Sequence, residues 1–433
     1  MNRWVLGGFR PLVGMLVLVA MGCAATPSIS PDGGVNDPSD GGMDEMDASD
    51  ADGDTAVVND GEGLSVGAFH ACHLAAGAVT CWGENAEGQL GNGSKDNKPL
   101  PTPIAPASGS AASAYKAVSA GGAHTCALTV AGMVVCWGNN IAGQLGTNAS
   151  TGSSVPVSVD AAGPATTYAS IAAGDNHTCA LTTTGTVHCW GQILGNARVP
   201  TQIPTPEGSI ASPKFVAVTS GVSHSCGLAE GGAAYCWGNN GSGQVGDGQT
   251  GVSAPAPKRV QSSVDGGTLS LASLSAGDAH SCGLTTEGTS LCWGGHANGA
   301  LGDGVTNTTT APLPQAVLGP GGGAALTFTT LVAGHQNTCG LMSDGKAYCW
   351  GSNDHAQTGT GDNGAAVGFP TAVAPQAGGA ALEFAVLGSG LFFACGLTND
   401  GSVYCWGDNA SGQLGVGSTS TTPSKVPVRV GPP

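Results

Sequence analysis

The most constraining feature of this sequence is a cysteine pair that recurs seven times, at intervals of 47 to 57 residues. The two cysteines lie ten positions apart in six copies and nine apart in the first, and Trp-Gly follows every second cysteine. The pairs are Cys72 with Cys81, Cys126 with Cys136, Cys179 with Cys189, Cys226 with Cys236, Cys282 with Cys292, Cys339 with Cys349, and Cys395 with Cys405. A regular repeat of this length predicts an array of similar structural units that pack against one another.

The spacing within each pair predicts a β-hairpin closed by a disulfide. If Cys126 and Cys136 face each other on antiparallel strands, the turn ends at Gly132, where a three-residue hairpin loop requires a left-handed backbone. The other ten-residue copies also have glycine there, and the shorter first copy predicts a two-residue turn at Ala76 and Gly77. Opposed residues on neighbouring strands lie within reach of a disulfide. Zinc is the alternative, but zinc ligands usually come as two close pairs, which this spacing does not provide.

The rest of each copy is also typical of β-structure. A short apolar run ending in glycine precedes the hairpin, glycine-punctuated turns follow Trp-Gly, and a proline-flanked β segment ends the copy. The 74 glycines, 25 prolines and 9% of charged residues favour short strands over long helices. About four strands per copy predict an all-β, seven-bladed β-propeller over residues 64–433. We expect residues 425–430 to act as a closing strand that pairs in the sheet of the first hairpin.

The motifs GxxHTCAL, GxVYCWG and NxxGQLGxG resemble the regulator of chromosome condensation repeat, over about residues 64–430. The resemblance implies a seven-bladed propeller and, from the founding intracellular branch, nucleotide exchange on a small GTPase. The copy at 171–200 departs from the pattern, because "WGQILGN" lacks the segment between Trp-Gly and Gly-Gln. We expect a short turn there. Intracellular members do not need the cysteine pairs, which favours an exported branch.

The N-terminus predicts export. Arg3 and Arg10 precede an apolar stretch at residues 11–21. The stretch has the length of a secretory signal and is too short to span a bilayer as a helix. The residues before Cys23 resemble a bacterial lipoprotein cleavage box, which implies lipid attachment to Cys23; an ordinary secretory signal is the alternative. Residues 1–22 are thus predicted to be a signal peptide, and 23–63 a lipid-anchored, disordered linker rich in Asp and Gly. The predicted location is a bacterial membrane, in particular the outer membrane, or the cell surface, or else the extracellular space.

Charge argues against nucleic acid as a partner. The formal net charge is −17, and residues 30–62 carry 11 of the 29 acidic side chains. The remainder is still acidic, and an acidic surface repels phosphate. Alternating carboxylates at 47–54 suggest calcium, but no register supplies both the glycine and the glutamate of a helix-loop-helix calcium loop.

A histidine two residues before the first cysteine is the most tempting functional feature. It occurs in five copies, as His70, His124, His177, His224 and His280. Equivalent positions in successive blades lie too far apart to share one metal ion, so we expect each imidazole to bond to backbone within or between blades. We assign no catalytic, cofactor-binding or metal-binding residue, because a catalytic set would need a feature unique to one blade.

These observations predict an exported, membrane-anchored propeller that serves as a protein-binding scaffold and is not an enzyme. We expect a monomer without a cofactor, an unidentified protein partner, and membrane contact only through the lipid on Cys23. One alternative is a regulator of a small GTPase that acts like a guanine-nucleotide exchange factor, but export would place this activity in the wrong compartment. The other alternative is a surface propeller that binds glycans, which the low charge permits.

Overall fold

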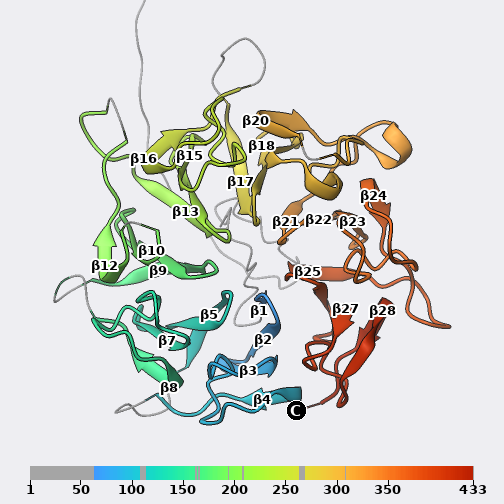
Figure 1. Cartoon of the computed structure of the whole chain (residues 1–433), viewed down its shortest axis with the longest axis horizontal. Coiled ribbons are helices and arrows are strands. Elements are labelled where there is room, and N and C mark those ends of the chain that lie inside the picture. The colour runs from blue at the N-terminus through green and yellow to red at the C-terminus, as the bar shows by residue number, and fades with distance from the viewer. Residues whose placement is uncertain are drawn as a thin grey trace, which may run out of the picture. The chain divides into compact units, whose positions relative to one another are not determined.

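The computed structural model describes residues 63–432, apart from 108–113, 161–162, 164–165, 194, 207–208, 263–268 and 308. The predicted signal peptide, the predicted linker up to residue 62, and Cys23 lie outside the described residues. In the described part of the chain, seven four-stranded antiparallel sheets stand around a central axis (Figure 1). The predicted all-β, seven-bladed propeller with four strands per blade is therefore confirmed.

Each blade consists of four consecutive strands, which run from the axis outward. The innermost strands are β1 (Gly63–Val66), β5 (Tyr115–Ala120), β9 (Tyr168–Ala173), β13 (Phe215–Ser220), β17 (Leu271–Ala276), β21 (Thr330–Ala333) and β25 (Phe384–Ser389). The second strands are β2 (His70–Ala75), β6 (His124–Thr129), β10 (His177–Thr182), β14 (His224–Ala229), β18 (His280–Thr285), β22 (Asn337–Leu341) and β26 (Phe393–Thr398). The third strands are β3 (Ala78–Gly83), β7 (Val134–Gly138), β11 (Val187–Gly191), β15 (Ala234–Gly238), β19 (Ser290–Gly295), β23 (Ala347–Gly351) and β27 (Val403–Asn409). The outermost strands are β4 (Lys98–Pro103), β8 (Ser153–Ser158), β12 (Ala197–Gln202), β16 (Ala254–Arg259), β20 (Thr310–Ala316), β24 (Val367–Ala372) and β28 (Ser420–Arg429). Two single-turn 3-10 helices, η1 (Ala297–Gly299) and η2 (Pro320–Gly322), lie in connections.

The second and third strands of every blade form a hairpin that carries a disulfide. Cys126 lies opposite Cys136 in the β6–β7 register, and in all seven hairpins the two Cα atoms are 4.0 or 4.1 Å apart. Gly132 ends the turn with a φ of 79°, as the three-residue loop requires. The shorter first hairpin turns through Ala76 and Gly77, both at positive φ. The pairs are those that the spacing predicts.

The hydrophobic core lies between the blades rather than inside any one of them. The tryptophan that follows each second cysteine is fully buried, and each one packs into a cluster shared by two adjacent blades. Trp137 of blade 2, for example, joins Leu74 and Leu90 of blade 1. A large aromatic side chain supplies much of the apolar area that such a boundary buries. A single repeat could therefore not bury its own apolar surface.

The predicted closing strand is wrong. Within the described residues, β28 pairs with β27, where Cys405 faces Val428, and the sheet of the first hairpin contains only β1 to β4. The first repeat supplies its own innermost strand and the last repeat its own outermost strand, so no blade lacks a strand that another end of the chain must provide. The ring closes instead by contacts between two complete blades: Leu64 and Trp82 of blade 1 share a cluster with Leu397 of blade 7, and hydrogen bonds cross the same boundary.

Two kinds of connection gather at one end of the propeller, which we call the loop face. The inner turns join the first and second strands of each blade, and the outer loops join the third and fourth; antiparallel strands place both at the same end. The disulfide hairpins turn at the opposite end, the hairpin face. Most outer loops are long, such as 139–152 in blade 2, but the outer loop of blade 3 spans only 192–196. This is the short turn expected from the sequence.

Candidate functional site

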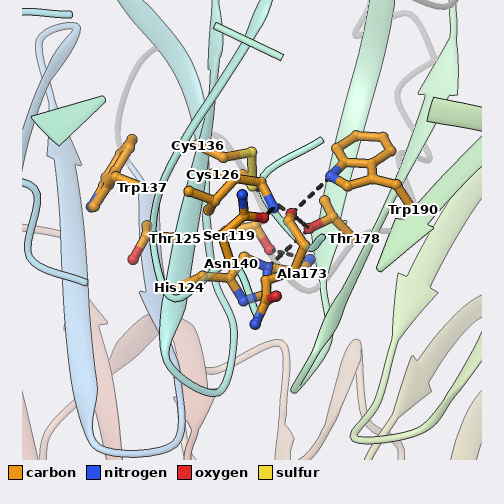
Figure 2. Close-up of a disulfide and its surroundings, with 12 residues drawn as sticks. Ser119, His124, Thr125, Cys126, Cys136, Trp137, Asn140, Ala173, Thr178 and Trp190 are labelled. Carbon is orange, nitrogen blue, oxygen red and sulfur yellow. Dashed lines mark hydrogen bonds between the residues drawn. A yellow bond between two sulfur atoms is a disulfide. The ribbon is translucent and has the colours of Figure 1, made fainter. Parts of the chain in front are cut away.

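Three side chains and one main-chain carbonyl join blades 2 and 3 (Figure 2). The Nε2 atom of His124 lies 2.9 Å from the hydroxyl of Thr178. That hydroxyl donates to the main-chain carbonyl of Gln144 at 3.0 Å, and Trp190 Nε1 donates to the same carbonyl at 2.8 Å. Because the hydroxyl proton is directed to Gln144, the hydroxyl accepts from the imidazole, whose proton must sit on Nε2. We call this arrangement the blade lock.

The blade lock is complete at four of the seven boundaries among the described residues. Its members are His70, Thr125, Gln89 and Trp137 between blades 1 and 2; His124, Thr178, Gln144 and Trp190 between blades 2 and 3; His224, Ser281, Gln244 and Trp293 between blades 4 and 5; and His280, Thr338, Ala300 and Trp350 between blades 5 and 6. The recurring histidines thus bond between blades as expected, but the partners of their Nε2 atoms are hydroxyl groups, where backbone was expected. The partner is a hydroxyl because, in the next blade, the residue directly before the first cysteine is Ser or Thr.

Burial keeps these imidazoles neutral. It lowers the pKa of His70, His177 and His224 to about 3 and that of His124 and His280 to about 4, and neighbouring imidazoles lower several of them further. A group with so low a pKa is a poor general base or acid near neutral pH. Within the described residues, no three His, Cys, Asp or Glu side chains come together in a way that could hold a metal ion. The histidines therefore act as structural parts of the lock.

Two boundaries use a reduced form of the lock. Between blades 6 and 7, Asn337 replaces the histidine and its Nδ2 atom donates to the Ser389 hydroxyl at 2.9 Å. Between blades 7 and 1, Phe393 takes the same position and packs in the apolar cluster of that boundary. Both boundaries keep the tryptophan bond, from Trp406 to the carbonyl of Gln357 and from Trp82 to that of Gln413, each at 3.0 Å.

The boundary between blades 3 and 4 differs from the other six. His177 still reaches the hydroxyl of Ser225 at 2.8 Å, but this hydroxyl lies 3.0 Å from the hydroxyl of Ser220 instead of bonding to a loop carbonyl. Trp237 is fully buried, yet its Nε1 atom has no hydrogen-bond partner. The outer loop that supplies the carbonyl elsewhere is the short one, 192–196. The shortened loop thus removes an acceptor but leaves its donor in place.

A belt of main-chain hydrogen bonds joins the inner turns around the axis. Ala68 N donates to Gly121 O at 3.2 Å, and Gly122 N donates to Gly174 O at 3.1 Å. The belt also crosses the point where the ring closes, because Leu391 N donates to Ala68 O at 3.2 Å. A Cβ atom on Gly121 would lie 2.3 Å from Gly174 O, so this position admits only glycine.

A cavity of about 100 Å³ lies on the axis and is lined largely by small residues of the innermost strands and the inner turns. Its hydroxyl groups take part in blade contacts: Ser65 accepts a bond from Ala120 N, and Ser119 accepts one from Ala173 N, both at 2.9 Å. Figure 2 includes the second of these contacts. The cavity is therefore part of the framework, and its serines are not paired with a base as a nucleophile would be.

The loop face carries aromatic and acidic side chains that occur in only some of the repeats. Phe69 and Phe392 of two inner turns meet edge to face, with ring centroids 5.9 Å apart, and His355 of an outer loop stacks on Phe392 at 4.0 Å. All three side chains are partly exposed. Across the ring, the inner turns of blades 3 and 5 carry Asp175 and Asp278, and burial raises the pKa of both carboxyl groups. The loop face therefore has an aromatic sector and an acidic sector.

The predicted membrane attachment depends on residues that the structure does not describe. Cys23, the predicted lipidation residue, lies outside them. In the described part of the chain, no helix is long and apolar enough to cross a membrane.

The fold, the repeated hairpins and the blade lock define a repeat-built β-propeller. The family model of the RCC1-like domain matches residues 42–374, and the model of the regulator of chromosome condensation (RCC1) repeat matches 387–413. The chain therefore belongs to the RCC1-like domain family, as the sequence motifs indicated.

Two proteins of Arabidopsis thaliana are similar to this chain. The ultraviolet-B receptor UVR8 of Arabidopsis thaliana is 28% identical over 370 residues, which cover 84% of this chain and 69% of that protein. The mitochondrial RCC1 domain-containing protein RUG3 of Arabidopsis thaliana is 28% identical over 369 residues, with the same coverage of both chains. The crystal structure of Prp20p from Saccharomyces cerevisiae superposes with a TM-score of 0.70 at 21% identity, over 87% of this chain and 88% of that one. At that identity, the likeness to Prp20p shows the shared fold alone.

Sequence reasoning missed two partners in the blade lock. The hydroxyl residue immediately before the first cysteine occurs in five copies, as Thr125, Thr178, Ser225, Ser281 and Thr338. The repeated Gln of the outer loop contributes its main-chain carbonyl. The recurring Ser or Thr was visible in the sequence directly after the histidine position. A main-chain carbonyl, in contrast, cannot be recognised from a pattern of side chains.

Proposed function

We propose that this chain is an exported, lipid-anchored β-propeller that binds a protein partner on its loop face and catalyses no reaction. Export is supported by the seven disulfides, whose cysteines are buried almost completely. Disulfides of this kind form and persist in oxidising compartments. The short apolar segment and the residues before Cys23 support a secretory signal and a lipid anchor.

The observation that carries the binding role is how the polar groups of the repeat are used. Its recurring histidines, the hydroxyls beside them and six of the seven repeat tryptophan N–H groups are engaged between blades, and the axis hydroxyls of Ser65 and Ser119 bond to neighbouring main chain. The loop face also carries side chains that are not shared by all repeats and are not used between blades in this way, because Phe69, Phe392 and His355 contact one another there and are partly exposed. A rigid frame that presents variable loops is a common design for a binding surface.

A protein is the favoured partner. The Prp20p structure was described together with its binding properties to Gsp1p and histones, so a propeller of this fold binds other proteins. Aromatic side chains are enriched where proteins meet, and the aromatic sector of the loop face fits that chemistry. An exchange-factor-like role is disfavoured by the disulfides, because a cytosolic regulator works in a reducing compartment.

Intact-mass analysis of the native protein tests export and anchoring. We expect a chain that begins at a lipidated Cys23 and is lighter by 14 hydrogens than its reduced form, two for each of the seven disulfides. A full-length, fully reduced chain would contradict the proposal.

Photo-crosslinking in the native host tests the binding face. Ile141 of the blade 2 outer loop and Val130 of the blade 2 hairpin are exposed by 77% and 63%, on opposite faces. We expect a photoreactive residue at 141, but not at 130, to give a discrete adduct with another protein. Phe69, in the aromatic sector, is a second loop-face position. Absence of adducts from both 69 and 141 would reject the loop face as the binding surface.

A further inference from the structure

We propose that the boundary between blades 3 and 4 is where the partner docks, by inserting a glycine-containing turn of its main chain. The turn takes the position that this chain's own outer loop fills at each of the other six boundaries. The inference rests on the proposed protein-binding function and specifies the site and the chemistry of the partner.

The six other boundaries show what this position binds. In each, one carbonyl of an outer loop accepts the indole N–H of the next blade at 2.8–3.0 Å. The glycine two residues later lies against the same indole. A Cβ atom on Gly146 would lie 2.9 Å from Trp190 Nε1, and its φ of 65° is left-handed. The position therefore accepts a carbonyl, then an apolar or small residue, then glycine.

A second contact recurs beside the first. A main-chain N–H of each long outer loop donates to a carbonyl of the outermost strand in the next blade. These bonds run from Gly93 to Ser154, Asn148 to Arg198, Gly248 to Pro312, Gly304 to Gly368, Gly361 to Lys425 and Gly417 to Pro99, at 2.7–3.1 Å. The outer loop thus uses its main chain in both directions, as acceptor and as donor.

Blade 4 receives neither contact from the described residues of blade 3. Trp237 Nε1 is buried without an acceptor, and among the described residues no bond of the second kind joins blade 3 to β16. A Cβ atom on Gly195 would meet nothing within 4 Å, so this glycine is not seated on the indole as Gly146 is. Of the described residues of the short outer loop, Ile193 packs its partly buried side chain against the cluster that contains Trp237. An apolar contact stands where a carbonyl is needed.

The surroundings of this boundary suit a polypeptide. Val252, in the outer loop of blade 4 just before β16, is 73% exposed. An unsatisfied buried N–H favours a ligand that brings an acceptor. A glycan could offer a hydroxyl, but it would not reproduce the apolar residue and the glycine that the equivalent positions hold. A protein turn supplies all three.

The chain provides its own probe for this site. A cyclic peptide with the sequence of residues 139–152 carries the turn that seats on Trp190, and the same peptide with Gly146→Val is its matched control. We would titrate each peptide into the full disulfide-bonded chain labelled with ¹⁵N-tryptophan and follow the indole N–H signals by NMR. The Trp237→Phe variant identifies the signal of Trp237.

The expected result is a saturable shift of the Trp237 indole signal at millimolar peptide, with the other six repeat indoles unmoved and at least tenfold weaker binding of the control. Replacing residues 192–196 with a copy of 139–152 should fill the site from within and abolish the shift. No shift of Trp237, an equal response to the control peptide, or unchanged binding to the grafted chain would each overturn the inference.

The outcome is separable from the proposed function. Adducts from the loop face without a peptide response at Trp237 would reject this docking site and leave the scaffold role standing. Loss of both would reject the scaffold role as well.

Discussion

The indole N–H of Trp137 donates a 2.8 Å hydrogen bond to the main-chain carbonyl of Gln89, a residue of the preceding blade. Trp237 holds the equivalent place in blade 4 and is equally buried, but its N–H has no acceptor. The same side chain in the same setting thus occurs once with its hydrogen bond and once without it. Comparing these two residues separates the contribution of tryptophan packing to stability from the contribution of its hydrogen bond.

We predict that Trp137→Phe destabilises the chain by about 1–3 kcal/mol more than Trp237→Phe. Both changes remove the same part of the indole, but only the first breaks a hydrogen bond, and the second removes a buried N–H that lacks a partner. Urea unfolding of the oxidised chain, followed by circular dichroism, measures the difference. Equal losses would mean that the indole bond adds nothing to the boundary.

Stability should fall as the pH is lowered below about 6.5. The five lock histidines have a pKa of about 3 or 4 in the folded chain against 6.5 unfolded, so the unfolded chain binds the extra protons. Their contribution is complete above pH 6.5 and is lost as the pH falls toward 4, by about 1.4 kcal/mol per pH unit for each histidine. Urea midpoints at pH 7 and pH 5 test this, and equal midpoints would contradict it.

One substitution should remove a single proton from this dependence. Ser220 in blade 4 corresponds to Ser389 in blade 7, which accepts a bond from Asn337 at 2.9 Å. His177→Asn can therefore make an analogous bond to Ser220 without a titrating ring. We expect the pH slope of its unfolding free energy to decrease by about one fifth of what the five lock histidines together contribute. A slope equal to that of the parent chain would show that His177 does not titrate on unfolding.

Replacing Cys126 and Cys136 together by alanine should cost about 2–3 kcal/mol. Each disulfide closes a loop of about ten residues, and the loss of that constraint on the unfolded chain has this magnitude. Thermal or urea unfolding measures the change, and an intact mass that shows six remaining disulfides is the control. The hairpin should still form, because its turn and strand pairing do not depend on sulfur. Complete unfolding would instead show that a single blade cannot survive without its disulfide.

The belt around the axis gives a further test. Gly121→Ala brings a Cβ atom to within 2.3 Å of Gly174 O, a main-chain atom of the next blade that cannot move aside cheaply. We expect a loss of about 2 kcal/mol or more, within the range of overpacking changes. Gly163→Ala, where the nearest atom would lie 3.6 Å away, is the control and should leave the midpoint unchanged. Similar losses in both variants would argue against a tight belt.

Most of the architecture could be predicted because the same pattern of cysteine, glycine and tryptophan occurs in all seven repeats. The position of Gly132 and the two-residue turn at Ala76 and Gly77 follow from hairpin geometry, and the structure has both. The means of ring closure could not be predicted, since a closing strand and side-by-side packing leave the same local pattern in residues 425–430. The structure shows packing, with Trp82 set between the first and last blades.

The candidate site was less predictable. The histidines stood out in the sequence, and bonds within or between blades were expected of them. Their partners, however, are hydroxyl groups in the next repeat, and Thr178 lies about 50 residues from His124 in the sequence. The carbonyl of Gln144 could not be found from side-chain patterns. The short turn of blade 3 was visible in the sequence, whereas its consequence for Trp237 emerged only from the contacts across the boundary.

Each repeat of the chain coincides with one complete blade, and no strand is exchanged between the two ends. Duplicating or deleting a repeat in the gene therefore adds or removes a whole structural unit, already stapled by its own disulfide. Rings of this kind can change size without inventing a new way to join their ends. At the boundary between blades 7 and 1, only the two facing surfaces must become complementary. Single substitutions can bring this about one side chain at a time.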